Sequence, residues 1–240
     1  MTLEAKGMRV ERGGKVLLRD VDVTANAGEI VGVLGPSGAG KSTLFRSLMG
    51  DLAPDGGTVR LGDDDISAWP MWRRARAGMG YVPQSPSVLW DLTVRANLET
   101  FRAIALGEKG DVTEVAKRME LDERLDVRAG ELSAGERRRL ELARAITRKP
   151  RVLICDEPFA GVDPKGAARL ADLLEELAQD DVAVMLADHH VAEALRVCSR
   201  AVLLLDGAVA LEAEPEEFQR HELVRGRYLG TWTRSIPPPP

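Results

Sequence analysis

The sequence predicts an α/β fold: a parallel sheet at the core, an antiparallel β-subdomain at the N-terminus and an inserted subdomain of helices. Short, wholly apolar segments recur along the chain, and strands that are buried on both faces have this composition. They alternate with helical patterns, which is typical of a parallel sheet. The first residues instead alternate apolar and polar side chains, which indicates half-exposed strands.

The expected elements follow in a definite order. In the first part of the chain they are a hairpin or meander at 3–26, a buried strand at 30–34, a helix at 42–49 and short strands at 58–61 and 79–82. After these come helices across about 94–142, strands at 152–155, 182–186 and 201–205, and helices at 165–178 and 191–197. Helix 165–178 carries four leucines on one face, which indicates a side packed on the sheet.

The bulk composition limits the class of protein. We expect one domain at 1–235, with a helical subdomain at about 85–145, and a proline tail at 236–240. The net charge of −5 and the 4% aromatic content argue against a nucleic-acid partner. Cys155 and Cys198 lack metal-binding spacing, which favours buried, reduced thiols in a cytoplasmic protein. We identify neither a signal peptide nor an apolar run long enough to span a membrane.

A phosphate-binding motif follows the first buried strand. Residues 35–42 match G-x-x-x-x-G-K-[ST], at the expected junction of strand and helix, which makes a chance glycine-rich turn the weaker interpretation. Glycines let backbone N–H groups approach phosphate oxygens, and the helix dipole favours the same anion. Lys41 would reach the β- and γ-phosphates, and the Ser42 hydroxyl would bind Mg²⁺. The predicted nucleotide-binding residues here are Gly35, Pro36, Ser37, Gly38, Ala39, Gly40, Lys41, Ser42 and Thr43.

Two adjacent carboxylates, Asp156 and Glu157, end the apolar strand at 152–155. On its own such a pair is more often a helix cap or a solvated turn. With a phosphate loop upstream, Asp156 suits Mg²⁺ and Glu157 suits a general base that polarises an attacking water.

Four further segments resemble those of ABC ATPases and stand in the order of that family. Leu132-Ser133-Ala134-Gly135-Glu136 is similar to the signature segment, and it begins 24 residues before Asp156. The other three resemble the glutamine loop, the D-loop and the switch, and they contain Gln84, Asp163 and His189. Taken singly, Asp163 better suits a helix N-cap, and His189 better suits a satisfied polar residue at a strand end. Together the motifs identify the chain as a member of the P-loop ABC ATPases.

The resemblance implies a mechanism. Two copies would bind two ATP molecules head to tail, with Ser133, Gly135 and Glu136 of one copy facing the phosphate loop of the other, and the signature helix would begin just after Ser133 and Gly135. The implied catalytic residues are Glu157, His189 and Lys41. The implied Mg²⁺ ligands are Ser42, Gln84 and Asp156, and Asp163 would also contact nucleotide. Gln84 would relay the nucleotide state to a pair of transmembrane subunits.

Two positions depart from the family pattern. Ala134 replaces the usual first signature glycine, and its methyl group would restrict the backbone or crowd the facing nucleotide. Because the first hairpin lacks an aromatic residue, Arg12 is the candidate for stacking on adenine, although a solvated arginine at a hairpin tip is an equal interpretation.

The resemblance is strongest to lipopolysaccharide-export ATPases. It rests on residues 62–67, 74–84, 136–139, 159–164 and 188–189, and on Arg227-Tyr228-Leu229-Gly230. It implies a homodimer on the cytoplasmic side of the inner membrane. The alternatives are the ATPase of a branched-chain amino-acid importer and a non-transport ATPase of iron–sulfur assembly. Val88, Leu89, Trp90 and Leu92 would either dock a membrane subunit or belong to the core.

Overall fold

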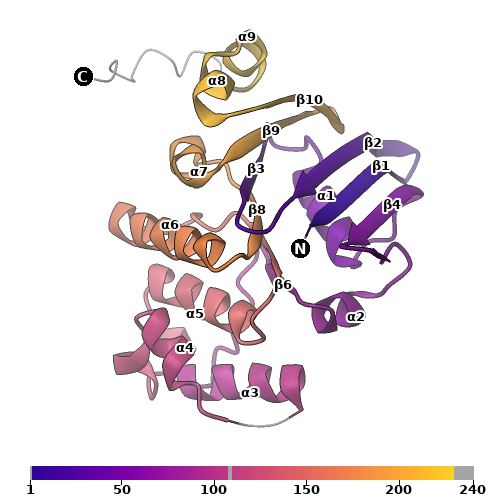
Figure 1. Cartoon of the computed structure of the whole chain (residues 1–240). Coiled ribbons are helices and arrows are strands. Elements are labelled where there is room, and N and C mark those ends of the chain that lie inside the picture. Colours follow the sequence, from indigo (N-terminus) through magenta and orange to yellow (C-terminus); the bar gives the residue numbers. More distant parts are fainter. Residues whose placement is uncertain (1, 108–109, 230–240) are drawn as a thin grey trace.

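The computed structural model describes residues 2–107 and 110–229, so the proline tail at 236–240 lies outside the described residues. It has two sheets and a separate group of helices (Figure 1). The larger sheet has six strands in the order β10-β9-β3-β8-β7-β6. Its strands are β3 (Ile30–Leu34), β6 (Met79–Val82), β7 (Val152–Asp156), β8 (Ala183–Ala187), β9 (Arg200–Leu205) and β10 (Ala208–Ala213). All pair in parallel except β10, which is antiparallel to β9.

The smaller sheet is antiparallel and has the order β2-β1-β4-β5. β1 (Leu3–Arg12) and β2 (Lys15–Ala25) form the expected hairpin, and β4 (Gly56–Leu61) and β5 (Asp64–Asp65) extend it. Gly13 and Gly14 in the turn have φ values of 59° and 74°, which glycine adopts without a steric penalty.

Two hydrophobic clusters meet at the central strand β3, whose five residues are all buried. Ile30 and Leu34 belong to the cluster on the side of α6, whereas Val31 and Val33 belong to the cluster that includes the antiparallel sheet. Helix α1 (Lys41–Met49) contributes Leu44, Phe45 and Leu48 to that second cluster, shown beside β1 and β2 in Figure 1. A strand with period-two side chains that is covered on both faces has to be apolar throughout.

The helical lobe lies below the larger sheet in Figure 1. It contains α3 (Val94–Leu106), α4 (Thr113–Arg118) and α5 (Ala134–Ile146), with 3₁₀ turns at Asp122–Arg124 and Ala129–Glu131. Helices α6 (Pro164–Gln179) and α7 (Val191–Val197) connect β7 to β8 and β8 to β9. Helices α6 and α7 match the expected ones within one residue at each end, and α3 begins at the expected residue, whereas α5 ends four residues beyond the expected limit of 142.

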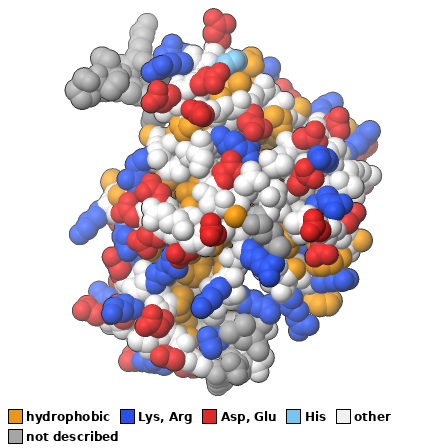
Figure 2. Space-filling model, viewed as in Figure 1, with side chains coloured by type: hydrophobic (Ala, Val, Ile, Leu, Met, Phe, Trp, Pro, Cys, Tyr) orange, Lys and Arg blue, Asp and Glu red, His pale blue; other side chains and the backbone are white. Residues whose placement is uncertain are grey.

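Several short elements were not expected from the sequence. They are β5, β10, α2 (Met71–Arg76), α8 (Pro215–Arg220), α9 (Glu222–Val224) and a single π-helical turn at Arg225–Leu229. None is longer than six residues, so none carries enough periodicity to be recognised. No helix within the described residues is both long and apolar enough to cross a membrane. Figure 2 shows basic and acidic side chains interspersed over the visible face.

Candidate nucleotide-binding site

The phosphate loop connects β3 to α1, and two of its glycines are required by close packing. At Gly35 (φ 154°) a Cβ atom would lie 2.2 Å from the carbonyl oxygen of Leu204. At Gly40 (φ 107°) it would lie 2.8 Å from the carbonyl oxygen of Leu17. Gly38 (φ 79°) has nothing within 4 Å of such an atom, so its backbone faces open space. The loop therefore packs against Leu17 and Leu204 on one side and is open at Gly38 on the other. A backbone loop that binds an anion requires such an open side.

Lys41, the first residue of α1, folds its side chain back over the loop. Its Nζ donates to the carbonyl oxygens of Gly35 at 2.7 Å and Pro36 at 3.0 Å. Burial lowers the pKa of the Lys41 ammonium, and neighbouring carboxylates, foremost Glu157, oppose this shift. The cation thus lies between the loop and the acidic strand ends, where it can bridge phosphate oxygens.

Asp156 ends β7 directly beside the start of α1. The residue is 2% exposed, its carboxylate is hydrogen-bonded to the Ser42 side chain, and its Oδ1 atom has no hydrogen-bond partner. Burial raises the pKa of the Asp156 carboxyl, and the Ser42 hydrogen bond opposes this. An unpaired buried carboxylate oxygen next to a serine hydroxyl is a set of hard oxygen donors, which is the chemistry that Mg²⁺ prefers. These two residues therefore fit the ion.

Glu157 has a strained backbone. Its φ is 53°, a left-handed value that is rare for a residue with a side chain. Its backbone N–H donates to the carbonyl oxygen of Ala187, at the end of β8, at 2.7 Å. The side chain is 19% exposed and its Oε2 lies 3.5 Å from Nδ1 of His189. The strain directs this carboxylate away from the strand and toward the loop after β8.

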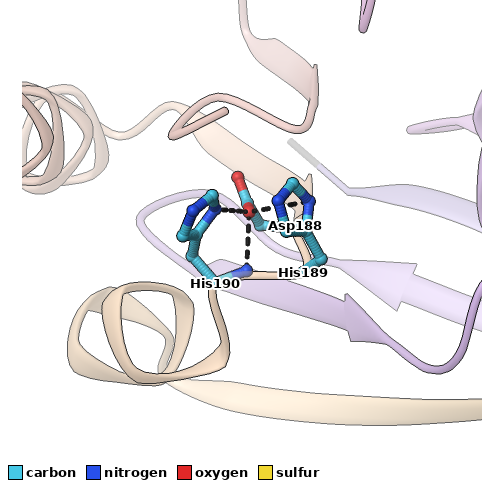
Figure 3. Close-up of side chains that lie close together, drawn as sticks. All are labelled: Asp188, His189 and His190. Carbon is cyan, nitrogen blue, oxygen red and sulfur yellow. Dashed lines mark hydrogen bonds and ion pairs between the residues drawn. The ribbon is translucent and has the colours of Figure 1, made fainter. Parts of the chain in front are cut away.

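The loop after β8 carries Asp188, His189 and His190 (Figure 3). Asp188 is fully buried: its Oδ2 accepts from the Phe159 backbone N–H at 2.9 Å, and its Oδ1 accepts from the His190 backbone N–H at 2.8 Å. The His190 ring lies with its Nδ1 2.9 Å from the same Oδ1. The His189 side chain is 59% exposed, so it faces the open side of the site.

Arg138 is a buried residue that sequence analysis did not select as functional. It lies on α5, is 6% exposed, and forms an ion pair with Glu141 at 2.6 Å. Its guanidinium also donates to four backbone carbonyl oxygens at 2.6–3.2 Å, those of Pro83, Asp156, Glu157 and Pro158. Arg138 therefore fixes the strained end of β7, the segment before Gln84 and the helix that follows the signature. An arginine in a basic run gives no sequence signal for such a role.

The phosphate loop, Glu157 and His189 line one cavity of about 640 Å³, a size suited to a nucleotide. Its lining includes eleven of the predicted residues: Gly35, Pro36, Ser37, Gly38, Gly40, Lys41, Ser42, Thr43, Gln84, Glu157 and His189. It also includes Lys15, Leu17 and Tyr228, which were not predicted. Burial raises the pKa of the Tyr228 phenol, which lies beside the Gly35 backbone. The last described turn of the chain thus closes one side of the cavity.

Three predicted residues of this half are not part of the cavity lining: Asp156, which is buried behind Ser42, Ala39 and Arg12. Ala39 is 3% exposed, and its carbonyl oxygen accepts from the Gly207 backbone N–H at 3.1 Å. Arg12 is not part of the cavity lining; its guanidinium pairs with Asp55 at 2.8 Å and donates to the carbonyl oxygen of Ala53 at 2.5 Å. In this conformation the Arg12 guanidinium is held by these partners at the hairpin tip.

The signature residues are placed by helix capping. Ser133 is the N-cap of α5, and Ser133 and Glu136 form a capping box, in which each side chain accepts from the other's backbone N–H. The helix begins at Ala134, so the expectation that it starts after Gly135 was wrong by two residues. Gly135 is buried. Asp163 caps α6 by accepting from Lys165 and Gly166, and none of these side chains lines the cavity.

The apolar segment after Gln84 divides between core and surface. Val88 is 4% exposed, whereas Leu89, Trp90 and Leu92 are 37%, 47% and 39% exposed. Three of the four residues therefore remain available for contact with another molecule, and the fourth anchors the segment.

Comparisons with known proteins agree with this geometry. The sequence pattern of the ABC transporter family matches residues 18–160. The chain is 39% identical, over 95% of its length and 96% of the relative, to the lipopolysaccharide export system ATP-binding protein LptB of Acidithiobacillus ferridurans. An ATP-binding cassette of an ABC transporter in its ADP conformation superposes with a TM-score of 0.88 at 25% identity, over 96% of this chain and 99% of that one. A dimeric bacterial cassette gives 0.79 at 24% identity, over 89% and 98%.

Proposed function

This chain belongs to the ABC transporter family as an ATP-binding, ATP-hydrolysing subunit, and from that premise we propose that it powers the export of lipopolysaccharide. The cargo comes from the similarity to the lipopolysaccharide export protein, which extends over 95% of the chain. Similar proteins from Escherichia coli and Haemophilus influenzae carry the same name, and these similarities do not favour an amino-acid importer or an iron–sulfur assembly ATPase.

The observation that carries the catalytic part of the proposal is the convergence of Lys41, Glu157 and His189 on one cavity. Lys41 and the backbone of the phosphate loop bind the phosphates of ATP. Glu157, aimed by its strained backbone, accepts a proton from the attacking water. His189, whose Nδ1 lies 3.5 Å from Oε2 of Glu157, holds that water and the terminal phosphate.

Ser42, Gln84 and Asp156 are the residues we assign to Mg²⁺. The pairing of the Ser42 side chain with a carboxylate that has an unpaired buried oxygen supports this assignment. When bound, Mg²⁺ neutralises charge that develops on the phosphate oxygens. Ser42 and Asp156 would hold the ion next to the phosphate loop, and Gln84 would sense its presence.

The active species in this proposal is a homodimer. Members of the ABC family work as dimers with transmembrane partners, and a cassette of the same fold has been solved as a dimer. Ser133, Gly135 and Glu136 are not among the residues that line the cavity around the phosphate loop of their own chain, and in this proposal they reach the nucleotide of the second copy. The N-terminal end of α5 has the polarity that suits the terminal phosphate held by that copy.

Two transmembrane subunits complete the transporter, and the chain would lie on the cytoplasmic face of the inner membrane. Leu89, Trp90 and Leu92, which follow Gln84 and are exposed, are the proposed contact with those subunits. A change at Gln84 on nucleotide binding would be transmitted through the adjacent segment to this surface.

The catalytic assignment is tested with Glu157→Gln, which removes the base and keeps the size of the side chain. We expect turnover to fall on the order of 1,000-fold while ATP binding persists, and the variant to elute as an ATP-dependent dimer in size-exclusion chromatography. Undiminished ATPase activity, or a monomer at saturating ATP, would contradict it.

The cargo is tested by purifying the chain from its native membranes in mild detergent and identifying the proteins that accompany it. We expect two transmembrane subunits of the lipopolysaccharide-export type. Permease subunits of another type would retain the motor assignment and overturn the cargo.

A further inference from the structure

Asp188, His189 and His190 form the one group of three potential metal ligands of this kind within residues 2–107 and 110–229. Figure 3 shows both imidazole rings turned toward one oxygen of the Asp188 side chain. The ring centroids of the two histidines are 4.1 Å apart, and one ligand atom from each of the three residues lies within 4.8 Å of the other two. We propose that this cluster is a binding site for Zn²⁺ or a similar transition-metal ion and that its occupation arrests the ATPase.

The distances between the ligand atoms suit such an ion. Nδ1 of His190 and Nδ1 of His189 lie 2.9 Å and 3.7 Å from Oδ1 of Asp188. Oε2 of Glu157 lies 3.5 Å from Nδ1 of His189, which offers a fourth ligand. Two ligands about 2.1 Å from a tetrahedral Zn²⁺ are about 3.4 Å apart. The observed separations lie on either side of this value, so small side-chain movements complete the site.

The ligand types distinguish this site from the proposed Mg²⁺ site. Mg²⁺ takes oxygen ligands and keeps several waters, and Asp156 and Ser42 offer oxygen only. Two imidazole nitrogens with carboxylate oxygens instead favour Zn²⁺, Cu²⁺ or Ni²⁺. The two ions would therefore bind side by side rather than compete for the same atoms.

The carboxylate at the centre is already fixed for this task. Asp188 is fully buried, and backbone N–H groups of Phe159 and His190 hold its two oxygens. Partners that fix a ligating carboxylate raise the affinity of metal sites. The ion would take the place of the contact between Oδ1 of Asp188 and Nδ1 of His190, and the imidazole would bind it through Nδ1 with its single proton on Nε2. The His190 side chain is 39% exposed, so an ion can approach from solvent.

Other soft ligands of the chain are poorly placed to compete. Cys155 and Cys198 are buried, and burial raises the pKa of each thiol to about 12, which keeps them protonated. His221, the only other histidine in the sequence, caps α9 through its Nδ1.

Inhibition follows from which groups the ion would engage, and this step rests on the proposed function. His189 and Glu157 are the residues assigned to the water and the terminal phosphate. An ion that binds their nitrogen and oxygen atoms removes both from catalysis without blocking the phosphate loop. Zn²⁺ should therefore lower turnover while ATP still binds.

The first experiment measures Zn²⁺ binding alone, by competition with a fluorescent zinc chelator in the absence of nucleotide. His190→Asn keeps an N–H donor toward Asp188 but removes the imidazole ligand. We expect affinity to fall on the order of 100-fold, since even outer-shell changes cost 10–100-fold. The matched control, His221→Asn, should bind as the wild type does. Equal affinity in His190→Asn and the wild type would overturn the site.

The second experiment measures ATPase activity at saturating Mg²⁺-ATP while free Zn²⁺ is raised. His190→Asn should retain turnover without zinc and should need on the order of 100-fold more Zn²⁺ for half inhibition. Tight, His190-dependent binding without inhibition would overturn the inhibitory role and leave the metal site in place. Absence of ATPase activity in the metal-free wild type would instead contradict the proposed function.

Discussion

Glu157, at the end of β7, and Ser133, at the start of α5, each stand where one element meets another, but their surroundings differ. Glu157 has a left-handed φ of 53°, and the neighbouring Asp156 keeps a buried carboxylate oxygen without a partner. Ser133 has an ordinary extended backbone (φ −61°, ψ 163°) and a complete capping box with Glu136. The end of β7 therefore combines a strained backbone with a buried carboxylate oxygen that lacks a hydrogen bond. The start of α5 has neither feature, because its capping hydrogen bonds are complete.

The difference indicates how each region binds nucleotide. The β7 end is preorganised within one chain, because α5 holds it through Arg138 and the cavity brings its residues together. The capping box of the signature region is complete without a ligand, and Ser133, Gly135 and Glu136 are not among the residues that line the cavity around the phosphate loop. A surface of this kind functions when another molecule is brought to it. The following predictions test this contrast in decreasing order of effect.

The largest effect should come from inactivating the phosphate loop in one chain and the signature region in another, and then mixing the two variants. Lys41→Ala disables the phosphate loop, Ser133→Ala disables the signature, and each alone should reduce turnover on the order of 100-fold. In a mixture, a heterodimer pairs the intact loop of one chain with the intact signature of the other. We expect ATPase activity of the mixture to recover to roughly a quarter of the wild type. No recovery would contradict a site that is shared between chains.

The control for this experiment addresses the capping role of Ser133. Thr93 caps α3 in the same way, through a hydrogen bond from the Ala96 backbone N–H at 3.1 Å. Thr93→Ala and Ser133→Ala should each lower stability by about 1 kcal/mol. Only Ser133→Ala should lower the turnover of the isolated subunit, which separates nucleotide contact from helix stability.

The next effect concerns the residue that supports the strained region. Arg138→Met would leave Glu141 buried without its cation and several carbonyl oxygens without a donor. We expect unfolding free energy to fall by about 3–5 kcal/mol and the melting temperature by roughly 10 °C. Arg137→Met is the matched control, because Arg137 stacks over Trp90 at 5.5 Å and should cost about 1 kcal/mol at most. If both variants lose the same free energy of unfolding in urea titrations, the ion pair and hydrogen bonds of Arg138 stabilise the fold no more than the contact between Arg137 and Trp90 does.

A smaller effect of opposite sign should appear at the unpaired carboxylate. Asp156→Asn removes a buried charge, so we expect stability to rise by about 1–3 kcal/mol at neutral pH while ATP hydrolysis is lost. Burial raises the pKa of the Asp156 carboxyl, so the folded state holds its proton more tightly than the unfolded state does. As pH falls through that pKa, the wild-type carboxylate becomes protonated and its buried charge disappears. The difference in unfolding free energy between Asp156→Asn and the wild type should therefore shrink. Urea titrations across pH will check this, and a destabilised variant would contradict stored strain at this end of β7.

The same contrast explains which parts of the molecule the sequence made predictable. The phosphate loop, Gln84, Glu157 and His189 belong to short contiguous motifs, and strand–loop–helix order alone brings them to one edge of a parallel sheet. Arg138 and Tyr228 reach the site from distant segments through side-chain packing. Their segments contribute to the family resemblance, but no pattern within them indicates a role at the site, so tertiary contact reveals that role.

Arg12 illustrates a limit of a different kind. Its stacking role was inferred from the position that the family gives an aromatic residue, but the carboxylate of Asp55 and the carbonyl oxygen of Ala53 hold its guanidinium. Those partners lie 41 and 43 residues away in sequence, so a local interpretation of the hairpin cannot include them.

The smallest effect should come from Ala134, the residue whose methyl group was expected to strain the signature. Ala134 is the first residue of α5 and has no positive φ, so its backbone does not need glycine. Ala134→Gly should lower stability by less than about 1 kcal/mol, because glycine favours the unfolded chain. Turnover of Ala134→Gly should stay within about twofold of the wild type, because the capping box of Ser133 and Glu136 holds the start of α5 in either variant. A large gain in steady-state ATPase activity would show instead that the methyl group crowds the nucleotide of the second copy, which would make the signature region the constrained one.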